Sequence, residues 1–218
     1  MATDAPARVT RASRVARLNG IYAILNEGPQ VVELAEAILD AGIGIVQYRA
    51  KTALRPETLR LLRVLTRQRA ALLVLNDDWR RALEFDCDGV HLGPGDDGFE
   101  EPRTVRAAMP ARLIGLSCGT AAEIARANEG DVDYLGVGPV FPTASKADAG
   151  AAIGVSGLRH LMRLSAIPVA AIGGISAENL PEVRRCGVAM AALISALSAA
   201  PQPRQAAERL LAVWSSRL

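Results

Sequence analysis

The sequence predicts a single α/β domain folded as a (β/α)8 TIM barrel. Short apolar segments alternate with amphipathic, helix-like segments along the whole chain, with no repeat, long linker or low-complexity tract between them. The 218 residues are enough for one well-buried core and few for two. Half of the residues are hydrophobic and only 4% are aromatic, so small and branched side chains dominate, as is typical of layered α/β proteins.

The apolar segments have the character of parallel strands, which are buried on both faces and therefore read as continuous apolar runs. We expect strands at 21–25, 44–49, 71–75, 89–92, 113–117, 134–138, 168–172 and 188–194. We expect helices between and after them at 31–41, 56–70, 79–85, 102–109, 121–128, 155–164, 177–186 and 203–215. Pro56 and Pro102 fit the first turns of two of these helices, and Ser176 marks the start of another.

A doubly wound open sheet is the alternative fold. It loses support because the sequence after the first strand reads Tyr22-Ala-Ile-Leu-Asn-Glu and contains no GxGxxG motif. We expect the barrel to occupy residues 19–218 and residues 1–18 to form an N-terminal arm, whose order the sequence leaves open. Arg8, Arg11, Arg14 and Arg17 recur in this arm, which favours a solvated or frayed turn over the alternative of a transit peptide.

Charge and cysteine content favour small-molecule chemistry. A net charge of +2 gives no electrostatic reason to expect a nucleic acid or membrane partner. Cys87, Cys118 and Cys186 are far apart and have no zinc-type spacing, which indicates reduced thiols. The absence of a signal peptide or an apolar membrane span favours the cytoplasm. A homo-oligomer remains an open expectation.

Polar residues follow the second expected strand, at the end where TIM barrels carry their chemistry. In extended chain, the two-residue period sends Gln47, Arg49 and Lys51 to the same side. Only Lys51 and Lys146 are lysines among 25 basic residues. Three converging donors suit a polyanion such as a diphosphate, and a merely solvated strand end is the alternative.

Acidic residues follow the next two strands. Asp77 and Asp96 are candidate Mg²⁺ ligands, because Mg²⁺ is typically held by one or two carboxylates together with substrate phosphate oxygens and water. The alternative is that these aspartates cap the following helices, the role we expect for Asp78 and Asp97. His91 lies within an apolar run, and we interpret it as a satisfied core histidine rather than a catalyst.

A second anion site is predicted after the fifth to eighth strands. Ser117 ends the fifth strand, and Thr143, Ser145 and Lys146 lie together on a long loop after the sixth. A Gly-Gly pair at 173–174 follows the seventh strand, and Ile194-Ser195 ends the eighth. Glycine amides and hydroxyls at these positions are typical of a phosphate-monoester site, although the glycines also suit a packing role.

Six blocks of sequence, in order along residues 20–196, resemble the thiamine-phosphate synthase family. They are QYRAK (47–51), LND (75–77), DGVHLG (88–93) with Asp96, IGLS (114–117), DYLGVGPVFPTASK (133–146) and IGGI (172–175). The resemblance implies that an aminomethylpyrimidinyl diphosphate loses diphosphate in a dissociative, Mg²⁺-assisted step. The nitrogen of thiazole phosphate then captures the methylene, giving thiamine phosphate.

The resemblance also implies residue roles. The pyrimidine diphosphate would be held by Gln47, Arg49, Lys51, Asn76, Ser117 and Lys146, of which Arg49, Lys51, Ser117 and Lys146 would assist the chemistry. Mg²⁺ would be held by Asp77 and Asp96, and the thiazole phosphate by Thr143, Ser145, Gly174, Ile194 and Ser195.

Three positions depart from the family pattern. Pro94 replaces a glutamine, Ser145 replaces a threonine, and Val188-Ala-Met190 replaces Ala-Asp-Gly, so we expect Met190 to crowd the phosphate pocket. Two rival functions remain: a thiazole tautomerase-like barrel, which usually has a histidine where Gly119 stands, and a non-catalytic phosphate sensor, which needs no metal pair.

Overall fold

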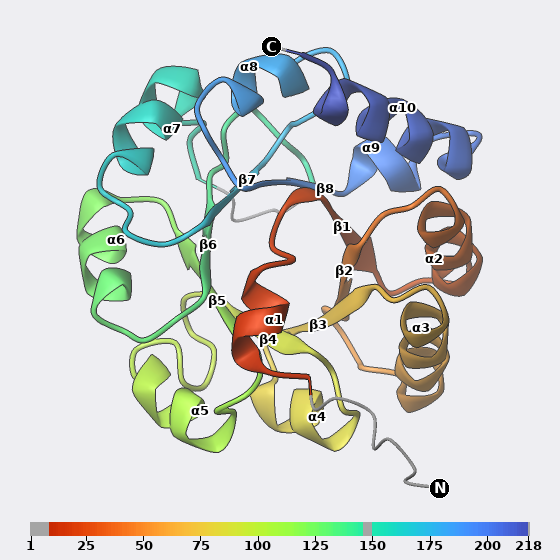
Figure 1. Cartoon of the computed structure of the whole chain (residues 1–218), viewed down its shortest axis with the longest axis horizontal. Helices are drawn as coiled ribbons and strands as arrows, with labels where there is room; N and C mark the ends of the chain where they lie inside the picture. The colour runs from red at the N-terminus through yellow and green to blue at the C-terminus, as the bar shows by residue number, and fades with distance from the viewer. Residues whose placement is uncertain (1–8, 146–149, 218) are drawn as a thin grey trace, which may run out of the picture.

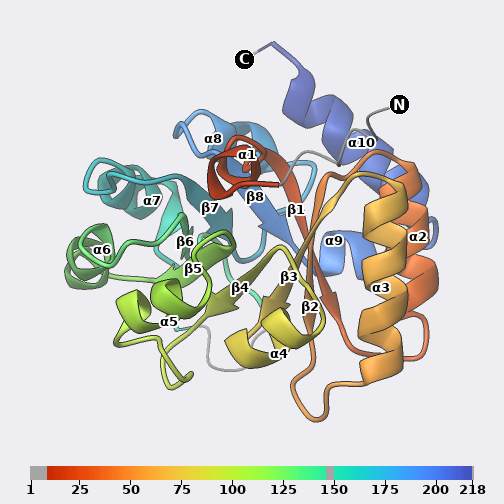
Figure 2. The ribbon, with the colours of Figure 1, turned by 60° about the horizontal axis from the view of Figure 1, so that its bottom comes forward.

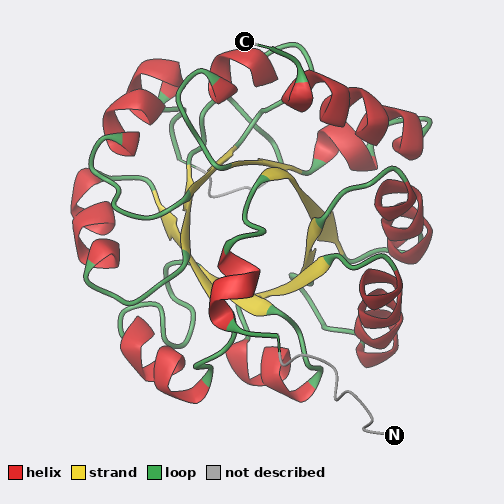
Figure 3. Cartoon of the chain, in the orientation of Figure 1, coloured by secondary structure: helices red, strands yellow, loops and turns green. Residues whose placement is uncertain are grey.

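The strands form one closed parallel barrel, surrounded by helices (Figures 1 and 3). This arrangement is seen in a computed structural model that describes residues 9–145 and 150–217. The strands are β1 Gly20–Asn26, β2 Ile45–Arg49, β3 Leu72–Asn76, β4 Gly89–Leu92, β5 Leu113–Cys118, β6 Tyr134–Val137, β7 Val169–Ile172 and β8 Met190–Leu193. Each pairs with the next in sequence and β8 closes on β1, so the predicted TIM barrel is confirmed.

The helices follow the order expected from the sequence, with two short additions. They are α1 Arg11–Val15, α2 Val31–Asp40, α3 Pro56–Gln68, α4 Trp79–Glu84, α5 Pro102–Ala108, α6 Ala121–Asn128, α7 Gly154–Met162, α8 Leu180–Arg184, α9 Ser195–Ser198 and α10 Pro203–Ser215. Pro56 and Pro102 do begin α3 and α5. The expected start near Ser176 is wrong, because α8 begins at Leu180 with Asn179 as its N-cap. Among the described helices, none is long and apolar enough to cross a bilayer.

Apolar side chains form two layers, one on each side of the barrel wall. Tyr22 and Ile24 on β1 point into the barrel, where they pack with Leu72 and Met190 from other strands. The alternate β1 residues Ile21, Ala23 and Leu25 pack outward against the helices. Near the carboxyl ends of β2 to β5, the strand residues that line the barrel opening are polar: Gln47, Asn76, His91 and Ser117.

The N-terminal end of the barrel, here called the floor, is covered by α1 (Figure 2). Arg14 is 5% exposed, and its guanidinium donates to Asp88 at 3.0 Å and to the backbone oxygen of Ala111. Arg11 donates to Asp133 at 2.6 Å. The expectation of a solvated N-terminal turn is therefore wrong for Arg11 and Arg14, while Arg8 lies outside the described residues.

Candidate active site

Two adjoining cavities lie at the carboxyl ends of the strands, here called the mouth. The aspartate cavity, of about 200 Å³, is lined by residues that include Gln47, Arg49, Asn76, Asp77 and Asp96. The glycine cavity, of about 370 Å³, is lined by residues that include Thr143, Ser145, Gly174, Ile194 and Ser195. The residues that line both cavities are Pro94, Ser117, Gly136, Ile172, Ala192 and Ile194. Two ligands bound at the mouth would therefore meet across a shared wall.

The donors on β2 divide between the strand and the loop after it. Gln47 is 2% exposed and donates from Nε2 to the hydroxyl of Tyr22 at 2.8 Å. Arg49, the last residue of β2, contacts the Asn26 side chain at 3.3 Å. Because the strand ends at Arg49, the two-residue alternation does not extend to Lys51, which is exposed and lines neither cavity. Lys51 can reach the mouth only by movement of its long side chain or its loop.

Asp77 and Asp96 both line the aspartate cavity, from neighbouring loops. Asp77 follows β3 in a left-handed conformation with φ of 68°, and its N–H donates to the backbone oxygen of His91 at 2.9 Å. Asp96 accepts the N–H of Gly93 at 2.6 Å. Asp78 caps α4, as expected, by accepting the N–H of Arg81. The N-cap of α4 is therefore Asp78 and not Asp77.

The donor set suits Mg²⁺ better than a metal held by protein alone. Within 9–145 and 150–217, no three His, Cys, Asp or Glu side chains gather closely enough to hold a metal. Two hard carboxylates on one cavity, beside Arg49 and Asn76, match the usual Mg²⁺ arrangement, in which substrate phosphate oxygens and water complete the shell.

Asp97 fastens the loop that carries Asp96. Its carboxylate accepts from the Trp79 indole at 2.9 Å and forms an ion pair with Arg80, whose guanidinium lies 4.1 Å from the Trp79 ring centre. Asp97 does not cap a helix, so that expectation is wrong. The contacts with α4 instead hold the loop from outside while Asp96 faces the cavity.

A chain of hydrogen bonds crosses the barrel beneath the aspartate cavity. Tyr22 and Tyr134 hydroxyls lie 2.9 Å apart, the Tyr134 hydroxyl lies 3.2 Å from His91 Nδ1, and His91 Nε2 lies 3.0 Å from the Ser117 hydroxyl. Burial raises the pKa of both Tyr22 and Tyr134. His91 is satisfied, as we expected, but it also lines the cavity. Tyr22 and Tyr134 were not predicted as site residues; the signal that could have identified them is a polar group at an inward-facing strand position.

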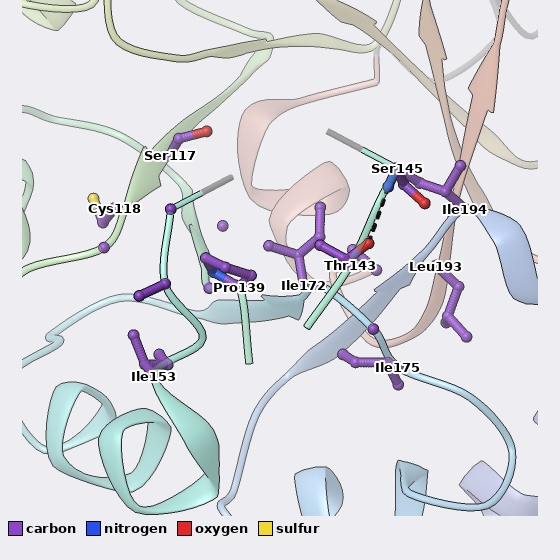
Figure 4. A pocket seen from close by; sticks show the side chains of 18 of the residues that line it. Ser117, Cys118, Pro139, Thr143, Ser145, Ile153, Ile172, Ile175, Leu193 and Ile194 are labelled. Carbon is purple, nitrogen blue, oxygen red and sulfur yellow. Dashed lines mark hydrogen bonds between the residues drawn. The ribbon is translucent and has the colours of Figure 1, made fainter. Parts of the chain in front are cut away.

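The glycine cavity is shaped by close backbone packing (Figure 4). Gly174 has φ of 63°, and a Cβ at this position would lie 2.6 Å from the Pro142 backbone oxygen. The Ser145 N–H donates to the Thr143 hydroxyl at 3.2 Å, and Ser195 begins the four-residue α9. Lys146, expected beside these hydroxyls, lies outside the described residues. The glycine backbone and the Thr143 and Ser145 hydroxyls therefore form the polar part of this cavity, near the ends of β7 and β8.

Sequence and structure comparisons connect this geometry with characterised proteins. The family model described as thiamine monophosphate synthase matches residues 21–197. A thiamine-phosphate synthase from Archaeoglobus fulgidus is 44% identical, over 82% of this chain and 84% of its own. Another, from Geobacillus thermodenitrificans, is 39% identical over 94% of this chain and 95% of its own. The chain belongs to the thiamine monophosphate synthase family. Membership makes it a transferase of thiamine biosynthesis.

A solved family structure has the same fold over nearly the whole chain. The thiamine phosphate pyrophosphorylase from Pyrococcus furiosus superposes with a TM-score of 0.82 at 37% identity, covering 92% of this chain and 97% of that one. A 3-hexulose-6-phosphate synthase superposes with a TM-score of 0.67 at 16% identity and shows only that the barrel fold is shared.

The positions that depart from the family pattern differ in their relation to the mouth. Met190 is fully buried in the inner barrel core and lines neither cavity, so the expectation that it crowds the phosphate pocket is wrong. Pro94 lies on the wall that both cavities share, and Ser145 lines the glycine cavity. Of these departures, Pro94 and Ser145 line the cavities at the mouth.

Proposed function

We propose that the mouth condenses 4-amino-2-methyl-5-(diphosphooxymethyl)pyrimidine with thiazole phosphate, giving thiamine phosphate and diphosphate. The observation that carries this proposal is the pair of cavities with a shared wall. One cavity is lined by carboxylate, amide and guanidinium groups, and the other by glycines and hydroxyls. Two different anionic substrates can lie next to each other in this arrangement.

The pyrimidine diphosphate would occupy the aspartate cavity. Arg49 and Asn76 would bind diphosphate oxygens, Gln47 and Ser117 would hold the ligand from the barrel side, and Asp77 and Asp96 would hold Mg²⁺. When bound, Mg²⁺ would neutralise the charge that develops on the departing diphosphate. We assign Lys51 and Lys146 to the same leaving group on the family resemblance, Lys51 after a movement of its loop.

The thiazole phosphate would occupy the glycine cavity. Thr143 and Ser145 would donate hydroxyl hydrogen bonds to its phosphate, and Gly174, Ile194 and Ser195 would contact it along the ends of β7 and β8. This placement holds the thiazole nitrogen at the shared wall, facing the carbon that loses diphosphate. Holding both partners in line supplies much of the rate enhancement, since a bimolecular step becomes effectively unimolecular.

The reaction would need no nucleophile from the protein. The C–O bond breaks with its electron pair leaving on the diphosphate, and the resulting pyrimidinylmethyl cation is stabilised by resonance. The thiazole nitrogen then donates its lone pair to form the C–N bond. The apolar residues Ile172, Ala192 and Ile194 on the shared wall exclude water from the cation.

The direct test incubates the purified protein with both substrates and Mg²⁺ and measures thiamine phosphate and diphosphate. We expect both products in equal amounts, and none after chelation of the metal. Asp77→Asn should abolish most of the product, whereas Asp78→Asn, its matched control, should retain it because asparagine also caps helices well. Isomerisation of a thiazole phosphate without any thiamine phosphate would refute the proposal and support the tautomerase-like alternative.

A further inference from the structure

The buried hydrogen-bond chain links a side chain on β2 to the wall between the two cavities. It runs from Gln47 through Tyr22, Tyr134 and His91 to Ser117, with successive distances of 2.8, 2.9, 3.2 and 3.0 Å. Its members come from β2, β1, β6, β4 and β5 in turn. The chain therefore spans the barrel interior and ends on a hydroxyl that lines both cavities.

Two glycines make room for the aromatic members of this chain. A Cβ on Gly115 of β5 would overlap the Tyr134 ring and lie 2.6 Å from His91 Nδ1. A Cβ on Gly136 of β6 would lie 3.0 Å from His91 Cε1. Backbone packing thus fixes where the rings stand, because protein interiors leave little free volume. The His91 and Tyr134 rings lie 5.5 Å apart between their centres.

Each hydroxyl in the chain has one hydrogen to donate, and the amide of Gln47 determines the direction. Tyr22 and Tyr134 are fully buried, and burial raises the pKa of each, so both stay protonated at neutral pH. Tyr22 accepts the Gln47 N–H and donates its own hydrogen to Tyr134. Tyr134 in turn donates to His91 Nδ1. A neutral imidazole that accepts at Nδ1 carries its hydrogen on Nε2.

We infer that this chain fixes the Nε2–H tautomer of His91, so that Nε2 donates to Ser117 and Ser117 presents its own hydrogen to the cavities. His91, Tyr134 and Tyr22 are then positioning residues that act through Ser117. The group that lies against Ser117 must be a hydrogen-bond acceptor. This last step rests on the proposed function, in which the acceptor is an oxygen of the departing diphosphate.

A preoriented donor is useful at this place because negative charge develops on that oxygen as the C–O bond breaks. A hydroxyl whose hydrogen already points to the cavity needs no reorganisation during the reaction, which is the basis of electrostatic preorganisation. If Ser117 instead directed a lone pair of its hydroxyl oxygen into the cavity, that lone pair would face the anionic diphosphate and repel it. The direction of the hydrogen bonds in this chain therefore affects the rate of the chemical step rather than the binding of thiazole phosphate.

The tautomer can be measured in ligand-free protein, independently of any activity. The protein contains only two histidines, His91 and the exposed His160, so ¹⁵N spectra of labelled protein give two resolvable imidazoles. At about pH 9, above the ordinary titration range of histidine, we expect His91 to be protonated at Nε2 and not at Nδ1. His160 serves as the reference for a solvated imidazole. A predominant Nδ1–H form of His91 would overturn the inference.

Tyrosine variants test the direction of the chain, and the protein offers a matched control. Tyr134→Phe removes the donor to Nδ1 and should bring His91 to the mixed tautomer population of His160. Tyr22→Phe should have a smaller effect, because Tyr134 can still donate. Tyr48→Phe removes the third tyrosine hydroxyl, which bonds Glu27 outside the chain, and should leave His91 unchanged. Equal effects of Tyr48→Phe and Tyr134→Phe would refute the inference.

Kinetics separate a failure of the inference from a failure of the proposed function. Tyr134→Phe should lower kcat about tenfold, the loss expected for one hydrogen bond that forms with a charged group, with the KM for thiazole phosphate unchanged. Full turnover in a Tyr134→Phe variant whose tautomer has changed would refute the link to Ser117. A wild-type protein with the expected tautomer but no synthase activity would instead refute the proposed function alone.

Discussion

Aspartates stand at both ends of the barrel, but their partners differ. At the floor, Asp88 accepts from Arg14 and Arg63 and from the backbone N–H of Leu73. Asp133 accepts from Arg11 and Arg106 and from the N–H of Ile114. At the mouth, Asp96 accepts an N–H of its own loop. The floor thus satisfies its carboxylates with two arginines each, whereas the mouth directs its carboxylates into a cavity.

Aspartates thus stabilise the fold at the floor, whereas at the mouth they line the candidate active site. Each floor aspartate precedes a strand and returns a hydrogen bond to the strand before it, so the ion pairs reinforce the β3–β4 and β5–β6 pairings. A buried charge with its partners in place is tolerated, but it becomes costly when one partner is removed. Asp77 and Asp96 instead line a cavity at the mouth, where the proposed Mg²⁺ and diphosphate would bind.

The largest effect on stability should come from removing a buried carboxylate charge at the floor. Asp133→Asn removes the charge from a side chain that is 1% exposed and leaves the buried Arg106 with only its longer ion pair to Asp131, at 3.7 Å. We expect the free energy of unfolding to fall by about 3–5 kcal/mol in urea titrations, with normal turnover by the fraction that remains folded.

The neighbouring Asp131 provides the matched control for this loss. Its side chain is 48% exposed and pairs with Arg11 at 2.8 Å. Asp131→Asn should cost less than about 1 kcal/mol, since solvent screens the pair and asparagine tolerates the left-handed φ of 55° at this position. Equal losses in the two variants would show that burial of the ion pair is not what stabilises the floor.

A smaller but still large effect should come from the mouth, on activity instead of stability. Asp96→Asn should lower kcat/KM about a hundredfold and weaken the dependence on Mg²⁺, because one proposed metal ligand loses its charge. The free energy of unfolding should change by less than about 1 kcal/mol, as the amide oxygen can still accept the Gly93 N–H. Asp97→Asn, whose oxygen can still accept the Trp79 N–H, should retain most activity. Unchanged kinetics in Asp96→Asn would remove this residue from the metal site.

Two glycines allow the mouth and the floor to be compared again, with a smaller expected effect. Gly174 at the mouth and Gly187 near the floor both have positive φ, at 63° and 86°, so alanine is strained at either position by about 1 kcal/mol. Only at Gly174 would the new Cβ also meet backbone, at Pro142. We expect Gly174→Ala to lose more stability than Gly187→Ala, and only Gly174→Ala to raise the KM for thiazole phosphate, by about tenfold. An equal rise in Gly187→Ala would attribute the effect to general strain.

Sequence patterns predicted the fold well because its signals are local. Each strand lies within two residues of its expected range, and the prolines that begin α3 and α5 set the helix starts without help from the rest of the chain. The segment α1 was missed because its order depends on Asp88 and Asp133, far away in sequence. No local pattern of five residues encodes such partners.

The mouth was predicted less completely, for a related reason. Residues at strand ends, such as Asp77 and Asn76, were found because every barrel strand ends at the same rim. The hydrogen-bond chain from Gln47 to Ser117 depends instead on the register of five strands and on two glycines that make room for the rings. The predicted convergence of Lys51 with Gln47 and Arg49 does not follow from the strand, because β2 ends at Arg49 and its two-residue alternation ends there.

The smallest expected effect is a fall in stability at high pH that comes from the buried tyrosines of the barrel. Burial raises the pKa of all three tyrosines, that of Tyr48 to about 12. The unfolded value is about 10, so above that pH the folded state binds more protons, and the free energy of unfolding must fall as pH rises. This contribution is fully present below about pH 10 and, for Tyr48, is lost as pH rises through about 12. Tyrosinate absorbance and circular dichroism, recorded together, should therefore change in a single step, with little tyrosinate while the protein is folded. Denatured protein should titrate near pH 10, and a folded protein that did the same would show that the tyrosines of the barrel are accessible to solvent.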